Sequence, residues 1–151
     1  MRKLFFPVVF IVTASALLAS CKTGTADNTE KAKKEIAQAE KDFEKMAADK
    51  GIAEAFSFFA DATATIKGNN DSLIHGKAGI RNLFSADRFK KATVNWSPDF
   101  VDAASSGELG YTYDKYSWHS PDSTGKINEF KGVFHTVWKK QKDGSWKFVW
   151  D

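Results

Sequence analysis

The sequence predicts an α+β domain: a strongly curved antiparallel sheet with three N-terminal helices packed on its concave face. Three observations lead to this fold class. From residue 30 to about residue 87, apolar residues recur at helical spacings of three and four. Beyond Ala92 the period changes to two, and β-branched and aromatic residues predominate. The later extended segments are long enough to curl a sheet, and helices followed by such strands are typical of an α+β fold.

Composition fits one globular domain. The chain has 151 residues, of which 42% are hydrophobic and 27% charged, close to globular averages. These fractions exclude a wholly disordered chain, a collagen-like repeat and a multi-pass membrane protein. A single cysteine, Cys21, excludes an internal disulfide framework.

The first 21 residues have the layout of an export signal. Arg2 and Lys3 precede an apolar run, residues 4–18, that is shorter than the roughly 20 residues needed to span a bilayer. The run ends in Leu18-Ala19-Ser20-Cys21, which resembles the lipobox of bacterial lipoproteins. This resemblance implies cleavage before Cys21 and lipidation of its thiol. The alternative is an ordinary secretory signal with an incidental cysteine.

Removal of residues 1–20 leaves a nearly neutral chain. Without Arg2 and Lys3 it carries 20 basic and 19 acidic side chains, so no net field attracts nucleic acid. Residues 21–29 hold no apolar side chain larger than alanine beyond the cysteine, and we expect them to form a flexible tether. Lys22 follows the cysteine where many inner-membrane lipoproteins have an acidic residue. The sequence therefore favours lipid anchoring in the cell envelope, at the periplasmic face of the outer membrane.

The predicted domain covers residues 30–151, and its helical half begins at Glu30. An apolar stripe predicts a first helix that ends at Gly51, with these residues on its inner face: Ala32, Ile36, Ala39, Phe43 and Met46. A second helix follows from Ile52 to about Asp61, and a third covers residues 77–87. Between them, residues 62–66 and 73–75 read as short strands on either side of a polar turn.

Four strands are expected in the second half, over residues 93–104, 108–119, 128–140 and 145–151. Turn-forming sequences separate them. Gly107 and Gly125 end the first two turns, and Asp143-Gly144 forms the last one, since Asp-Gly between alternating runs is a strong hairpin signal.

Several segments carry a family resemblance, which covers residues 30–151. They are GIAEAF at 51–56, FFADA at 58–62, IHGK at 74–77, SGELGYTY at 106–113 and VWKKQKDGSWK at 137–147. Together they resemble a SnoaL-like family of unassigned function within the nuclear transport factor 2-like superfamily. The resemblance implies a bent sheet around three helices, a pocket at the wide end of the cone, and homodimerisation through the outer side of the sheet.

Aromatic side chains are the candidate pocket walls, although core and dimer packing is the alternative explanation for each. The set comprises Phe56, Phe59, Trp96, Tyr111, Tyr113, Phe134 and Trp138. Asp61 and His135 are candidate bases and Tyr113 a candidate hydrogen-bond donor, should the protein be an enzyme. A helix-to-strand cap for Asp61 and a structural histidine at 135 are the competing interpretations. The three histidines lack zinc-site spacing, so we expect neither a metal nor another cofactor.

Three functions fit these observations. The leading hypothesis is a membrane-anchored periplasmic domain that binds a small apolar or amphipathic ligand without catalysis. The second is a cofactor-free isomerase, cyclase or dehydratase, since folds of this superfamily host enzymes such as ketosteroid isomerase beside binding domains. The third is a protein-interaction module of the envelope.

Overall fold

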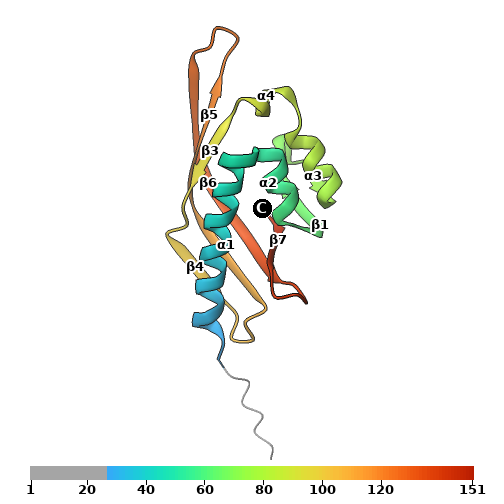
Figure 1. Ribbon diagram of the computed structural model, residues 1–151, viewed down its shortest axis with the longest axis vertical. Coiled ribbons are helices and arrows are strands. Elements are labelled where there is room, and N and C mark those ends of the chain that lie inside the picture. Colours follow the sequence, from blue (N-terminus) through green and yellow to red (C-terminus); the bar gives the residue numbers. More distant parts are fainter. Residues whose placement is uncertain (1–26) are drawn as a thin grey trace, which may run out of the picture.

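The computed structural model describes residues 27–151, which form one mixed α+β unit (Figure 1). The signal, Cys21 and most of the predicted tether lie outside the described residues. The helices are α1 (Thr29–Lys50), α2 (Ile52–Phe59), α3 (Gly76–Phe84) and α4 (Asp87–Lys90), with a 3-10 turn at Asn69–Asp71. The strands are β1 (Ala60–Lys67), β2 (Leu73–His75), β3 (Thr93–Trp96), β4 (Phe100–Ala103), β5 (Leu109–Pro121), β6 (Ile127–Lys140) and β7 (Trp146–Trp150).

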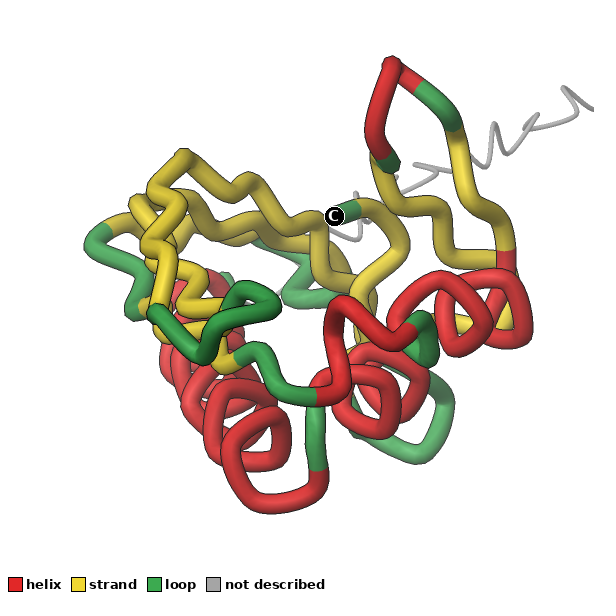
Figure 2. Tube along the Cα trace, turned by 90° about the horizontal axis from the view of Figure 1, so that it is seen from above, coloured by secondary structure: helices red, strands yellow, loops and turns green. Residues whose placement is uncertain are grey.

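The strands form a single curved sheet in the order β2-β1-β7-β6-β5-β3, with β4 also paired to β5. Figure 2 shows the helices gathered on one side of this sheet. The predicted fold class, a curved sheet with helices on its concave face, is therefore confirmed. The sheet is not wholly antiparallel, because β1 runs parallel to β7. The chain between β1 and β7 contains α3, α4 and β2 to β6, so it is far longer than the roughly dozen residues that a parallel pair needs.

Several boundaries differ from the prediction, and α2 ends at Phe59 with β1 beginning at Ala60, where the helix was expected to reach Asp61. The expected strand 93–104 is divided into β3 and β4, which pair with different halves of β5. Pro98 lies in the gap and has no N–H to donate, so the strand cannot continue through it as a regular ladder. The segment predicted as one helix over residues 77–87 is also divided, into α3 and a short fourth helix, α4.

Phe43 of α1 is the centre of an aromatic core. Its ring centroid lies 4.7 Å from that of Phe56 on α2 and 5.0 Å from that of Phe59. The ring of Trp96 on β3 approaches to 4.8 Å with a near-perpendicular, edge-to-face orientation. Such packing fixes α1 and α2 against the concave face, while α3 and α4 lie beyond α2 (Figure 1).

Glu40 is a charged residue inside this core, with 1% of its surface exposed. Its carboxylate accepts hydrogen bonds from Nε1 of Trp96 at 2.8 Å, from Nε1 of Trp138 at 2.9 Å and from Oγ1 of Thr112. Burial raises the pKa of Glu40, while these donors act in the opposite direction. One side chain of α1 is thereby bonded to β3, β5 and β6 at once.

Candidate functional site

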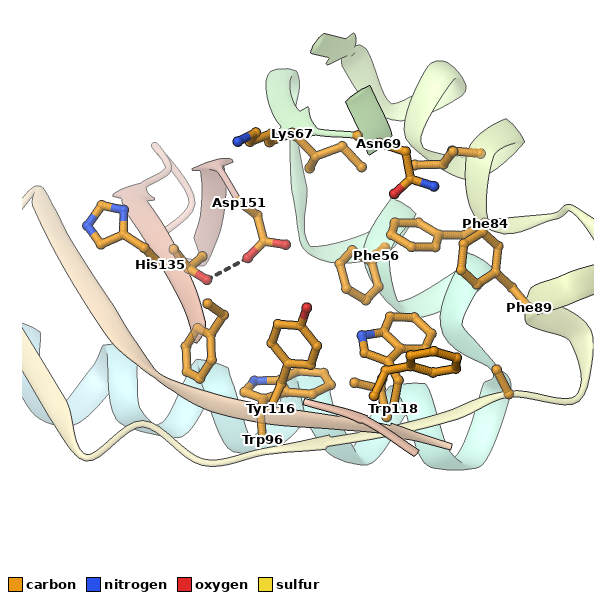
Figure 3. A pocket seen from close by; sticks show the side chains of 18 of the residues that line it. Phe56, Lys67, Asn69, Phe84, Phe89, Trp96, Tyr116, Trp118, His135 and Asp151 are labelled. Atoms are coloured by element: carbon orange, nitrogen blue, oxygen red, sulfur yellow. Dashed lines mark hydrogen bonds between the residues drawn. The ribbon is translucent and has the colours of Figure 1, made fainter. Parts of the chain in front are cut away.

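A cavity of about 900 Å³ lies between the concave face of the sheet and helices α2 to α4 (Figure 3). Ten of its lining residues are aromatic: Phe43, Phe56, Phe84, Phe89, Trp96, Tyr116, Trp118, Phe130, Phe134 and Trp150. Their rings pack on one another, since the Phe84 centroid lies 4.2 Å from that of Phe56 and 5.1 Å from that of Phe89. The walls are therefore held by the packing of the protein itself.

A β-bulge places Asp151 in this cavity. Trp138 and Val137 are consecutive on β6, but they pair with Phe148 and Trp150, so β7 has one residue more than its partner at this point. The extra residue reverses the alternation of side chains along β7. Asp151 then faces Thr136, on the same side of the sheet as Trp138, and Thr136 Oγ1 donates a hydrogen bond to Asp151 Oδ1 at 2.6 Å.

Burial dominates the electrostatics of Asp151. It raises the pKa of this carboxyl from 3.8 to about 6, and the hydrogen bond from Thr136 only partly opposes the shift. Among residues 27–151, Thr136 is the one side chain that hydrogen-bonds to the Asp151 carboxyl. The second oxygen of the carboxyl is therefore available to a molecule in the cavity.

Tyr116 of β5 supplies a second polar group. It pairs across the strands with Gly132, and its ring lies flat over that residue, because a Cβ at position 132 would stand only 2.5 Å from Tyr116 Oη. The glycine thus leaves the space that the phenol occupies. In Figure 3 the Tyr116 hydroxyl and the Asp151 carboxyl point into the same part of the cavity.

Two basic residues line the cavity, Lys67 and Arg88, and both are exposed. The Lys67 ammonium pairs with Asp71 at 2.7 Å, and the Arg88 guanidinium lies 4.7 Å above the centre of the Phe89 ring. Asp151 is the only carboxylate among the cavity residues that the structure describes. The cavity is accordingly apolar, with one acidic group inside and two cations where it meets solvent.

The predicted wall residues fall into three groups. Phe56, Trp96 and Phe134 line the cavity. Phe59 and Trp138 are buried in the core beside it. Tyr111 and Tyr113 lie on the outer face of the sheet, where they are 36% and 42% exposed.

The outer face has its own aromatic contacts. The Tyr113 ring stacks on Phe100 with centroids 4.6 Å apart, and the Tyr111 ring lies 5.8 Å from that of His135. The predicted donor, Tyr113, is therefore directed away from the cavity.

Neither of the two predicted bases, Asp61 and His135, points into the interior of the cavity. Asp61, at the start of β1, accepts hydrogen bonds from the backbone N–H and the hydroxyl of Thr63, and the backbone bond is the largest cause of its lowered pKa. This is the local capping role that was its alternative interpretation. His135 borders the cavity, but its exposed ring points away from the aromatic interior (Figure 3). His135 of β6 pairs with Tyr113 of β5. Asp61 is neither part of this pair nor among the residues that line the cavity.

Sequence reasoning missed Asp151, Tyr116 and Glu40. Glu40 carried a visible signal: it follows Ile36 by four positions and precedes Phe43 by three, so it interrupts an apolar stripe. Tyr116 alternates with Tyr113 along β5, and nothing in the local sequence decides which of the two side chains faces the concave side. Asp151 had no such signal, since its direction depends on the bulge.

No cluster of three or more histidine, cysteine, aspartate or glutamate side chains in the described residues could hold a metal ion. Within the same residues, no helix combines the length and apolar character needed to cross a membrane.

No protein-family model and no curated protein matches the sequence. Solved structures nevertheless share the fold. A Salmonella enterica protein of the nuclear transport factor 2-like superfamily is similar with a TM-score of 0.65 at 15% identity, over 80% of this chain and 88% of that one. A ketosteroid isomerase-like protein from Erwinia carotovora gives a TM-score of 0.61 at 13% identity, covering 76% and 89% of the two chains.

A third neighbour is the association domain of CaMKII from C. elegans, with a TM-score of 0.62 at 18% identity over 80% of this chain and 93% of that one. The fold is the nuclear transport factor 2-like cone. At these identities the likeness concerns the fold, so the function has to be argued from the site itself.

Proposed function

We propose that the domain binds a small apolar or amphipathic molecule in the cavity above the concave face of its sheet. The observation that carries this proposal is a cavity of about 900 Å³ with ten aromatic lining residues. Ligand sites in proteins are concave and mostly apolar, with a few polar groups that orient the ligand. Here Asp151 and Tyr116 are those polar groups, and the aromatic walls supply the apolar contact.

A neutral fluorescent probe, N-phenyl-1-naphthylamine, tests this proposal. Its fluorescence should rise when it transfers from water into the cavity, and a Trp118→Ala variant, which removes one wall, should weaken binding at least fivefold. Tyr111→Ala is the matched control, because it removes an aromatic ring from the outer face. Equal losses in both variants, or no fluorescence increase with the wild-type protein, would contradict a binding cavity.

We further propose that the domain is a lipoprotein of the cell envelope, anchored through Cys21 to the outer membrane and facing the periplasm. Support comes from the Leu18-Ala19-Ser20-Cys21 sequence and from Lys22 after it. Two or more acyl chains on one cysteine give stable membrane anchoring. The full chain expressed in a bacterium should incorporate labelled palmitate and fractionate with outer membranes. Cys21→Ser should abolish both, and soluble or inner-membrane wild-type protein would contradict this assignment.

A second candidate function, cofactor-free proton transfer, is favoured by the convergence of Asp151 and Tyr116. A carboxylate with a pKa of about 6 can accept a proton near neutral pH, while a phenol can donate a hydrogen bond to a developing oxyanion. These two residues replace Asp61, His135 and Tyr113 as the group that would carry the chemistry. A panel of β,γ-unsaturated ketones in deuterated buffer should then gain deuterium with the wild-type protein and not with Asp151→Asn. Equal incorporation with both proteins would contradict this candidate.

A further inference from the structure

We propose that the ligand of the cavity carries a positive charge, as an apolar amine or another organic cation, and that Asp151 pairs with it. This inference rests on the proposed binding function and specifies its ligand class.

Among residues 27–151, no cationic side chain pairs with the Asp151 carboxyl. Its one side-chain hydrogen bond comes from the neutral Thr136 hydroxyl at 2.6 Å. Lys67 is close along the backbone, where its N–H donates to the Asp151 carbonyl at 2.9 Å, but its ammonium turns outward to Asp71. A desolvated carboxylate with one neutral donor is a poorly compensated charge, so a cation that enters the cavity gains a strong interaction.

Aromatic faces surround the space into which this carboxyl points. Tyr116, Trp96, Trp118 and Phe56 are arranged around it in Figure 3. The negative faces of such rings attract organic cations, and several rings around one site are the usual receptor for a substituted ammonium group. Rings alone would equally accept a neutral apolar molecule. The combination of rings with a single carboxylate is what favours a cation.

The remaining charges do not reverse this preference. Arg88 and Lys67 are exposed, and each has a partner of its own in Phe89 and Asp71. On the sheet, Asp114 of β5 lies on the inner side with Tyr116, and the buried Glu40 of α1 is close enough for Asp151 to raise its pKa. The ring of His135 is directed outward (Figure 3). The carboxylates therefore disfavour an anionic group at this depth.

Matched ten-carbon probes test the ligand class by calorimetric titration at pH 8, with decylamine, decanol and decanoate kept below their aggregation concentrations. Decylamine should bind at least tenfold more tightly than decanol, and decanoate should bind most weakly. In Asp151→Asn, which keeps the shape of the side chain, decylamine should lose at least tenfold in affinity while decanol changes less than twofold. Asp122→Asn, at the exposed β5–β6 turn, should change neither.

The outcomes separate the two proposals. If none of the three probes binds, the proposed function itself fails. If decanol or decanoate binds as tightly as decylamine, or if Asp151→Asn weakens decylamine and decanol alike, the cavity binds apolar ligands and the cationic class is wrong. At pH 5, where Asp151 is mostly protonated, the advantage of decylamine over decanol should shrink severalfold, and an unchanged advantage would overturn the pairing.

Discussion

Asp151 is the residue on which most of the chemistry of the cavity depends. Its carboxyl is half-buried, and among the described side chains only Thr136 hydrogen-bonds to it. Its charge therefore disfavours folding in the absence of a ligand. Residues of this kind are often retained for binding or catalysis, where the same group gains a partner that the empty protein does not provide.

The raised pKa of Asp151 predicts a pH-dependent stability. The folded-state value of about 6 lies above the ordinary 3.8, so the neutral form is favoured by folding. Stability from this group is present below pH 4 and is lost as the pH rises through 6. A shift of roughly two units corresponds to about 3 kcal/mol. Asp151→Asn should thus stabilise the protein by up to about 3 kcal/mol at pH 8 and by much less near pH 4.

Urea unfolding at both pH values measures this difference. A variant that is equally stable to the wild type at pH 8, or whose advantage does not decline toward pH 4, would show that the Asp151 carboxyl is solvated in the folded protein. Thr136→Val offers a complementary check, because it removes the only side-chain donor to this carboxyl among residues 27–151 and should raise its pKa further.

Substitution of Glu40 should lower the stability of the fold, because its carboxylate is a hydrogen-bond acceptor inside the core. Glu40→Ala leaves the indole N–H groups of Trp96 and Trp138 without their acceptor in a buried setting. We expect a loss of about 3 kcal/mol or more in the free energy of unfolding. Lys41→Ala, at the adjacent exposed position of α1, should change it by less than about 0.5 kcal/mol. Similar small losses in both variants would mean that the buried carboxylate is dispensable.

At the scale of elements, the helices and strands that could be predicted are those marked by hydrophobic periodicity or by turn-forming residues in the local sequence. The stripe of α1 and the Asp-Gly turn before β7 are local patterns, and both elements appear where they are expected. The division of the strand at Pro98 was also visible in the residue type, although the prediction ran the strand through it. Helix faces were predicted correctly for Ile36 and Phe43, which are buried.

The candidate site is predicted less well, because it depends on pairing between distant strands. Trp96, Phe56 and Phe134 were found from residue type, as large aromatics that had to pack somewhere. The sequence could not decide which face of β5 and β6 is concave, so Tyr113 was chosen and Tyr116 was not. The β7 bulge is a register effect, and only the pairing of Val137 with Trp150 reveals it.

At the scale of the whole molecule, the outer face of the sheet is an unusual surface. It exposes large apolar side chains on neighbouring strands, among them Leu109 at 43%, Tyr113 at 42% and Val133 at 71%. Contiguous patches of this kind often mark contacts with other proteins. Homodimerisation through this face is therefore a proposal that a single substitution can test.

Tyr113→Asp places a charge on that face, at a residue that does not line the cavity. If two copies associate there, the wild-type domain should sediment as a dimer at about 100 μM and the variant as a monomer, because a charge buried at an interface without a partner is costly. Ser123→Asp, at the exposed β5–β6 turn, should sediment like the wild type. A monomeric wild-type domain, or a dimeric Tyr113→Asp, would contradict dimerisation through the outer face.

The central claim is that the concave side of the cone, and not its outer face, receives an apolar ligand. Nuclear magnetic resonance of the domain with indole-labelled tryptophan tests it directly during titration with decanol or decylamine. We expect saturable shifts of the indole signals of Trp96 and Trp118, which line the cavity, and little change at Trp146, which does not. Shifts absent from Trp96 and Trp118, or equal at all the tryptophans, would contradict it.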